Sequence, residues 1–125
     1  MKPHFKTQVV ARLTNPENGG TWTLELPLVF VSQIAGILVV PGGFETDFAS
    51  VPRLVLAYGL VGNTAHAAAV VHDYIYRTPG VSLTRAEADG VMLEAMEATG
   101  IPWWRRQLIY TGVRMGGGGA FKERS

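Results

Sequence analysis

Three short segments hold the residues whose types and spacing could support chemistry. The first reads GFETDFASVPR and contains the carboxylate of Asp47 and the guanidinium of Arg53. The second contains the adjacent pair His72 and Asp73, and the third contributes Asp89. Carboxylates and an imidazole can act as general acids and bases or bind a divalent cation, and an arginine can hold an anion. The sequence therefore predicts one catalytic site that gathers all five residues.

The strongest sign of such a site is the position of Asp89 within the helix expected over residues 85–99. At 100° per residue, Asp89 falls beside Met92 and Met96, away from the polar side. The expected solvent-facing stripe of this helix consists of Glu87, Gly90, Glu94 and Glu97. A buried carboxylate without a partner is costly or becomes protonated. We therefore expect Asp89 to bind Arg53, a histidine, a backbone donor or a cation.

His72 and Asp73 belong to a helix expected over residues 65–77. Adjacent helical residues point about 100° apart, so one ion cannot easily take both as ligands. If His72 faces inward, Asp73 lies on the polar stripe and forms an ion pair with Arg77, four residues further on. Asp73 would then be an orienting residue or a separate ligand.

Each candidate residue also has a purely structural interpretation. Asp47 would cap local backbone N–H groups, His72 would be a hydrogen-bonded core histidine, and Asp89 would form a buried pair with Arg53. A histidine–aspartate phosphohydrolase site is rejected, because His66 and Asp73 would lie about 10.5 Å apart along one helix. A serine nucleophile is not favoured either, since no nucleophile-elbow motif is present.

The order of the predicted elements indicates an α+β fold. Alternating apolar residues predict a small N-terminal antiparallel β-meander, and three to four helices then pack on it. The whole chain, 1–125, forms a single domain. Its expected parts are residues 1–43, mainly strands; 44–58, the motif loop and a short helix; 64–119, the helical part; and 120–125, a polar tail.

The composition limits the classes of function. Hydrophobic residues make up 47% of the chain, which excludes a disordered protein, and the absence of cysteine excludes disulfides and thiolate metal sites. A net charge of +1 gives no general attraction to nucleic acid. No signal peptide or membrane span is expected, so the chain should be made in the cytoplasm. The arginines of the helix over residues 103–115 are interpreted as snorkelling side chains of a core helix.

The segments VPGGFETDFASVPR, AAAVVHDYIYR and EADGVMLEAMEATGI closely resemble the phage and prophage family known as domain of unknown function 1353. The resemblance covers roughly residues 39–119, with the three motifs in the family's order and spacing. It implies an origin in a tailed phage or prophage and no settled activity. The family's characteristic positions fall on Gly43, Phe44, Thr46, Asp47, Ser50, Pro52, Arg53, His72, Asp73, Tyr76 and Asp89.

Two functions follow as hypotheses. In the first, the protein is a small hydrolase in which Asp47, His72 and Asp89 surround a divalent cation such as Zn²⁺ or Mn²⁺ with an open position for water. Arg53 would clamp an anion. The phage setting suggests a peptide or cell-wall amide as substrate.

In the second hypothesis, the protein is a tail-associated virion component or an assembly protein, and the same residues form a buried structural network. The tryptophan-rich last helix would then contact other phage structural proteins. The protein would be made in the host cytoplasm and reach the virion. A weaker third alternative is a protein that binds a host defence factor.

Overall fold

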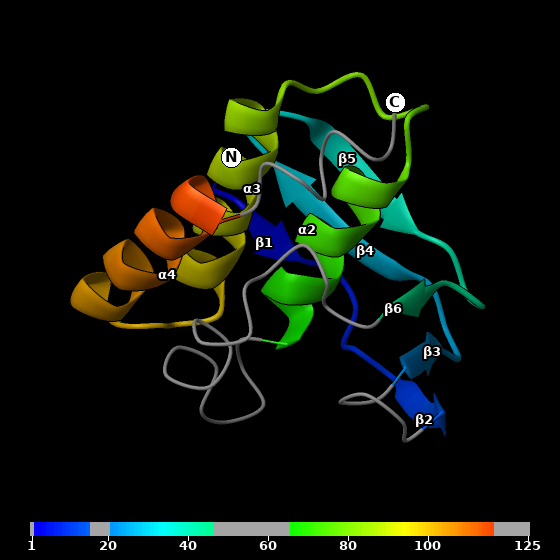
Figure 1. Ribbon diagram of the computed structural model, residues 1–125. Helices are drawn as coiled ribbons and strands as arrows, with labels where there is room; N and C mark the ends of the chain where they lie inside the picture. Colours follow the sequence, from blue (N-terminus) through cyan, green and yellow to red (C-terminus); the bar gives the residue numbers. More distant parts are fainter. Residues whose placement is uncertain (1, 16–20, 47–65, 117–125) are drawn as a thin grey trace.

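The computed structural model describes residues 2–15, 21–46 and 66–116, and it confirms the predicted α+β fold (Figure 1). Strands occupy the N-terminal part and helices follow. The elements are β1 (His4–Phe5), β2 (Ala11–Asn15), β3 (Thr21–Leu24), β4 (Leu28–Ser32), β5 (Gly36–Val40), β6 (Glu45–Thr46), α2 (His66–Arg77), α3 (Arg85–Ala98) and α4 (Trp103–Gly116). The short helix expected within residues 44–58 and the polar tail over residues 120–125 lie outside the described residues.

The strands form two antiparallel sheets where the sequence predicted one meander. The strand order is β1-β4-β5 in the first sheet and β2-β3-β6 in the second. Between β1 and β2, the hydroxyl of Thr7 donates to the Pro27 carbonyl and accepts from the Val29 amide. This side chain takes over contacts that backbone groups make in a regular ladder. The chain can then leave the first sheet and enter the second.

The hydrophobic core lies between the first sheet and the helices. Along β4 and β5 the inward residues alternate as a two-residue period requires, with Leu28, Phe30, Leu38 and Val40 buried. They pack in one cluster with buried residues of all three described helices, and α3 contacts β1 and β4 directly. Figure 1 shows α4 at the periphery, packed along α3. The core thus holds α2 and α3 side by side and leaves one face of α4 outward.

Helix α3 begins and ends where local chemistry predicts. The Thr84 hydroxyl accepts from the Glu87 amide at 3.1 Å, and the Glu87 carboxylate accepts from the Thr84 amide at 2.9 Å. These reciprocal bonds make a capping box. After the helix, Gly100 adopts a φ of +81°, a conformation that side chains other than glycine rarely take. The boundaries of α3 are therefore set by its own ends, and its packing against α2, α4 and the first sheet sets its direction.

The solvent-facing stripe predicted for α3 is partly wrong. The Glu94 carboxylate accepts hydrogen bonds from the Ser32 hydroxyl at 2.5 Å and the Gln33 amide at 3.0 Å. A Cβ added at Gly90 would lie 2.9 Å from the terminal methyl of Ile34. The turn between β4 and β5 covers this part of the helix, a non-local contact that the helical wheel does not contain.

Over the ranges 2–15, 21–46 and 66–116, none of the helices has the length and apolarity needed to cross a lipid bilayer.

Candidate functional site

Helix α2 carries two groups of polar side chains that point in different directions. His72 and Tyr76, four residues apart, face α3, whereas Asp73 and Arg77 face β6. This division follows from helical geometry, because neighbouring residues are rotated by about 100°. His72 and Asp73 therefore serve different partners, as predicted from their positions on the helix.

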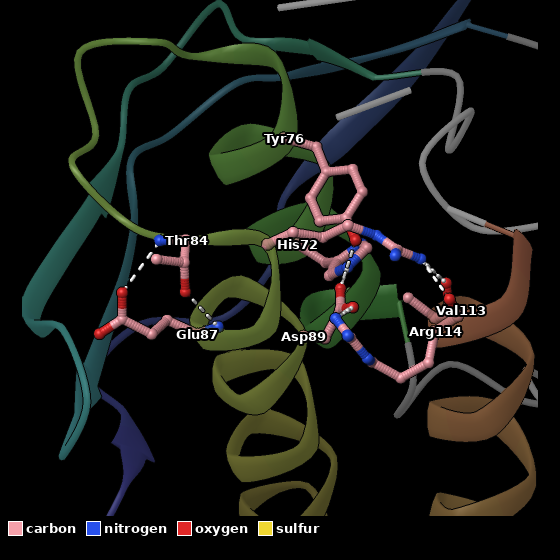
Figure 2. Close-up of polar contacts among 8 residues, drawn as sticks. His72, Tyr76, Thr84, Glu87, Asp89, Val113 and Arg114 are labelled. Carbon is pink, nitrogen blue, oxygen red and sulfur yellow. Dashed lines mark hydrogen bonds and ion pairs between the residues drawn. The ribbon is translucent and has the colours of Figure 1, made fainter. Parts of the chain in front are cut away.

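The group that faces α3 is centred on the carboxylate of Asp89 (Figure 2). Asp89 Oδ1 lies 2.7 Å from His72 Nε2 and accepts a hydrogen bond from the Tyr76 hydroxyl. Asp89 Oδ2 accepts from Arg114 Nη1 at 2.8 Å. His72, Tyr76 and Asp89 are fully buried, which confirms the burial predicted for Asp89. One carboxylate thus joins α2, α3 and α4.

Asp89 and its three partners, His72, Tyr76 and Arg114, form the Asp89 network. The three partners hold the carboxylate of Asp89 in its charged form. Burial alone would raise the pKa of Asp89, but hydrogen bonds from His72, Tyr76 and Arg114 outweigh burial and lower it. Burial and the adjacent carboxylate raise the pKa of Tyr76, so the phenol keeps its proton. The hydrogen bond with Asp89 raises the pKa of Arg114 further. The site therefore combines an ionised acid, a guanidinium and a neutral phenol.

The end of α4 is held in place by a second arginine. Arg85 Nη2 donates to the Val113 carbonyl at 3.1 Å and also to the Arg114 carbonyl. These are carbonyls of the last helical turn, which have no partner within the helix. Arg85 stands at the start of α3, four residues before Asp89, so the same two helices supply both contacts. This arrangement positions the Arg114 side chain against Asp89.

The group that faces β6 is centred on the carboxylate of Asp73. Asp73 Oδ2 accepts from the Thr46 hydroxyl at 2.6 Å and lies 3.4 Å from Arg77 Nη1. The predicted ion pair with Arg77 is therefore confirmed, but the exposed position predicted for Asp73 is wrong because β6 buries it completely. Its other oxygen, Oδ1, has no hydrogen-bond partner among the described residues.

The beginning of the GFETDFASVPR segment packs against α2. Gly43 turns the chain with a φ of +88°, which only glycine adopts readily. The Phe44 ring then meets Tyr74 edge-on at 5.4 Å, and Arg77 Nη1 donates to the Glu45 carbonyl at 2.9 Å. Together with the bond from Thr46 to Asp73, these contacts bring the first and second predicted motifs together.

The predicted five-residue site can be followed in part. His72 and Asp89 meet directly, and Asp73 lies next to His72 in the chain with different partners. Two members of the predicted site lie outside the described residues. They are Asp47, predicted as a base or metal ligand, and Arg53, predicted as an anion clamp. Sequence reasoning missed Tyr76 and Arg114 as partners of Asp89. The one available signal was that a buried acid needs a cation, and several arginines could have met that need.

The contact between His72 and Asp89 bears on the predicted metal site. Two ligands of one Zn²⁺ or Mn²⁺ ion would stand roughly 3.0–3.4 Å apart, from metal–ligand distances of about 2.0–2.2 Å. His72 Nε2 and Asp89 Oδ1 are 2.7 Å apart, and both carboxylate oxygens already accept hydrogen bonds. These two atoms fit a hydrogen-bonded pair better than a shared ion. No group of three or more His, Asp or Glu side chains within the described ranges could hold a metal. The full set with Asp47 stays a prediction.

Comparison with known proteins gives one match. The model of the family described as "Protein of unknown function (DUF1353)" matches residues 22–113. This range contains all three predicted motifs, and it ends one residue before Arg114. Neither the curated proteins nor the solved structures include a significant match to the chain.

Proposed function

Because the chain belongs to the family DUF1353, whose description states no activity, we propose a function from the geometry of the Asp89 network. The protein is a small hydrolase of peptide or cell-wall amides, and His72 and Asp89 form its proton-transfer pair. The observation that carries this proposal is the 2.7 Å contact between His72 Nε2 and an ionised, fully buried carboxylate.

A carboxylate in this position fixes both the orientation and the tautomer of an imidazole. With Nε2–H donated to Asp89, Nδ1 is the nitrogen that would take a proton from an attacking water. The water oxygen would then bond to the amide carbon, and the proton held by His72 would pass to the leaving nitrogen as the C–N bond breaks. Asp89 would stabilise the imidazolium formed in between, as carboxylates do in catalytic triads.

The energetic cost of the network also favours a functional role. A buried ion pair is often no more stabilising than well-packed apolar residues of similar volume. Asp89 nevertheless occupies a face of α3 that otherwise holds Met92 and Met96, both buried. Groups with shifted pKa values concentrate at functional sites, and the pKa values of Asp89 and Tyr76 are both shifted.

Other predicted residues take supporting roles in this proposal. Asp47 and Arg53 would complete the site as a second carboxylate and an anion clamp. Asp73, held by Thr46, would orient the segment that carries them. A Zn²⁺ or Mn²⁺ ion would require His72 and Asp89 to separate, so we favour a site in which they act as a pair. The phage or prophage origin implied by the resemblance makes a cell-wall amide the preferred substrate.

The experiment that tests this proposal measures amide hydrolysis by the purified protein. Dye-labelled peptidoglycan and a mixture of labelled peptides serve as substrates, assayed with and without added Zn²⁺ or Mn²⁺. We expect the original chain to release dye and His72→Gln to release none. His4→Gln, which changes a histidine on β1, is the control and should release dye as the original chain does. Absence of release from both substrates under all metal conditions, with a correctly folded protein, would contradict the proposal.

A second candidate function is favoured by the complete burial of the Asp89 network. His72, Tyr76 and Asp89 have 0% exposure, and with Arg114 they tie three helices together, as a network that only fixes the fold would do. The protein would then be a virion or assembly component without catalytic activity. Mass spectrometry of purified phage particles would detect the protein, and His72→Gln would lower stability without any catalytic effect to measure. Binding to a host defence factor remains a weaker alternative.

A further inference from the structure

The outward face of α4 carries a stripe of apolar side chains that no described element covers. Trp104, Leu108 and Met115 are 56%, 65% and 83% exposed, and Thr111 between them is also exposed. The opposite face of the same helix, with Ile109 and Val113, is buried against the core. Most surface helices of globular proteins are apolar on one face only. Here a second apolar face points to solvent.

The spacing of this α4 stripe is that of a helix–helix seam. Trp104, Leu108, Thr111 and Met115 follow one another at intervals of four, three and four residues. At 100° per residue they fall within about 60° of one another, which is the narrow line that the a and d positions of a coiled coil form. A partner that binds through a sheet edge or a flat surface would not match the spacing of four, three and four residues. The partner that matches it is another helix.

The charges on α4 indicate what kind of helix would fit. The helix contains Arg105, Arg106 and Arg114 and no acidic residue. Arg105 and Arg114 fall on opposite flanks of the stripe. Arg114 is already bound to Asp89, whereas the Arg105 guanidinium lies over the Trp104 ring at 5.3 Å and makes no ion pair with the described residues. Arg106 falls on the opposite side of the helix, so Arg105 gives one flank of the stripe its positive charge.

From this combination we propose that the α4 stripe is a docking site for an acidic amphipathic helix of another protein. Leucine residues of the partner pack along Trp104, Leu108 and Met115, and glutamates or aspartates on one edge of the partner helix face Arg105. This inference is independent of the hydrolase proposal, since the stripe and Arg105 include no member of the Asp89 network.

Two other occupants fit less well. A second copy of this chain would place arginines against arginines in either orientation, because α4 offers no carboxylate. A single-stranded nucleic acid would need aromatic platforms along its whole path, but the exposed aromatic residues of the stripe are confined to its N-terminal end, where Trp103 adds to Trp104. The remainder of the stripe is aliphatic or small.

The test uses a designed peptide of about three heptads with leucine at a and d and glutamate at the flanking positions. Its counterpart carries lysine in place of glutamate. Binding to the full chain is followed by fluorescence anisotropy. We expect the glutamate peptide to bind and the lysine peptide to fail, with affinity that falls as salt rises. Leu108→Glu should lower the affinity about tenfold or more, as at a central interface residue.

Ile37→Glu supplies the matched control, because Ile37 on β5 is 66% exposed, almost the same as Leu108 at 65%. Circular dichroism confirms that both variants are folded, and the control should bind the glutamate peptide as the original chain does. Four results would overturn the proposal: equal binding of both peptides, equal loss in both variants, a dimer that Leu108→Glu dissociates, or binding of a single-stranded oligonucleotide in place of the glutamate peptide.

Discussion

Asp89 Oδ1 lies 2.7 Å from His72 Nε2, and both side chains are completely buried. The two residues come from different helices, and Arg114 from a third helix binds the other carboxylate oxygen. A buried, ionised aspartate thus connects the packing of α2, α3 and α4 with the orientation of one imidazole.

Replacement of Asp89 by asparagine should destabilise the fold strongly. The amide has one acceptor oxygen in place of two, and its NH₂ group would face the donors His72, Tyr76 or Arg114. Breaking one side of a buried charged network costs about 3–5 kcal/mol. Urea unfolding of Asp89→Asn measures this loss. Glu97→Gln, an exposed change on the same helix, is the control and should leave the unfolding midpoint unchanged. An Asp89→Asn variant as stable as the original chain would show that the network carries no stability.

The stability of the protein should also depend on Asp89 at acidic pH. The folded state has the lower pKa, so the unfolded chain takes up this proton first as the pH falls. The contribution of Asp89 is therefore present above the ordinary aspartate pKa of about 3.9 and is lost as the pH drops through the folded value. Unfolding free energies measured from pH 6 to pH 2 should fall less steeply in Asp89→Asn. Parallel curves for the two proteins would contradict the assigned direction.

At alkaline pH the stability of the protein should depend on Tyr76. Burial and Asp89 raise the pKa of this phenol, so the folded state keeps the proton to higher pH than the unfolded chain does. Its contribution is present below the ordinary tyrosine pKa of about 10 and is lost as the pH rises through the folded value. Tyr76→Phe should therefore flatten the loss of stability above pH 10. Tyr110→Phe, a partly buried residue of α4, serves as comparison, and an equal flattening there would argue against the prediction.

How far the site could be read from the sequence depends on whether each contact is local. The capping box of Thr84 and Glu87 is a contact within one helical turn. The burial of Asp89 was predicted from its place among Met92 and Met96 on the same helix, and it is confirmed. The α+β order of the elements is confirmed as well, because alternation and helical periodicity are properties of short windows.

The contacts that could not be predicted join residues far apart in the chain. Arg114 reaches Asp89 across 25 positions, and Thr46 reaches Asp73 across 27. A helical wheel placed Asp73 on a polar face, since it contains no information about the strand that covers that face. The division of the strands into two sheets has the same origin, because it depends on the bonds between Thr7 and the segment from Pro27 to Val29.

The contact between Thr46 and Asp73 gives a further prediction. Thr46→Val removes the closest hydrogen-bond donor of a buried carboxylate while it keeps a side chain of similar shape. Leaving such a group unsatisfied costs about 1–3 kcal/mol. The loss should appear in urea unfolding, and Thr111→Val on the exposed face of α4 should be neutral. If Thr46→Val and Thr111→Val changed the free energy of unfolding equally, the buried hydrogen bond would make no specific contribution to stability.

The most direct test of the central claim is the protonation state of each nitrogen in the His72 ring, measured by nitrogen-15 NMR. If Asp89 orients His72 as proposed, Nε2 carries the proton at every pH at which the ring holds only one. In Asp89→Asn, where the bond from Nε2 to a carboxylate is lost, the other tautomer should gain population. A ring that carries its single proton on Nδ1 in the original chain would contradict the account, because Nε2 would then have no proton to donate to Asp89.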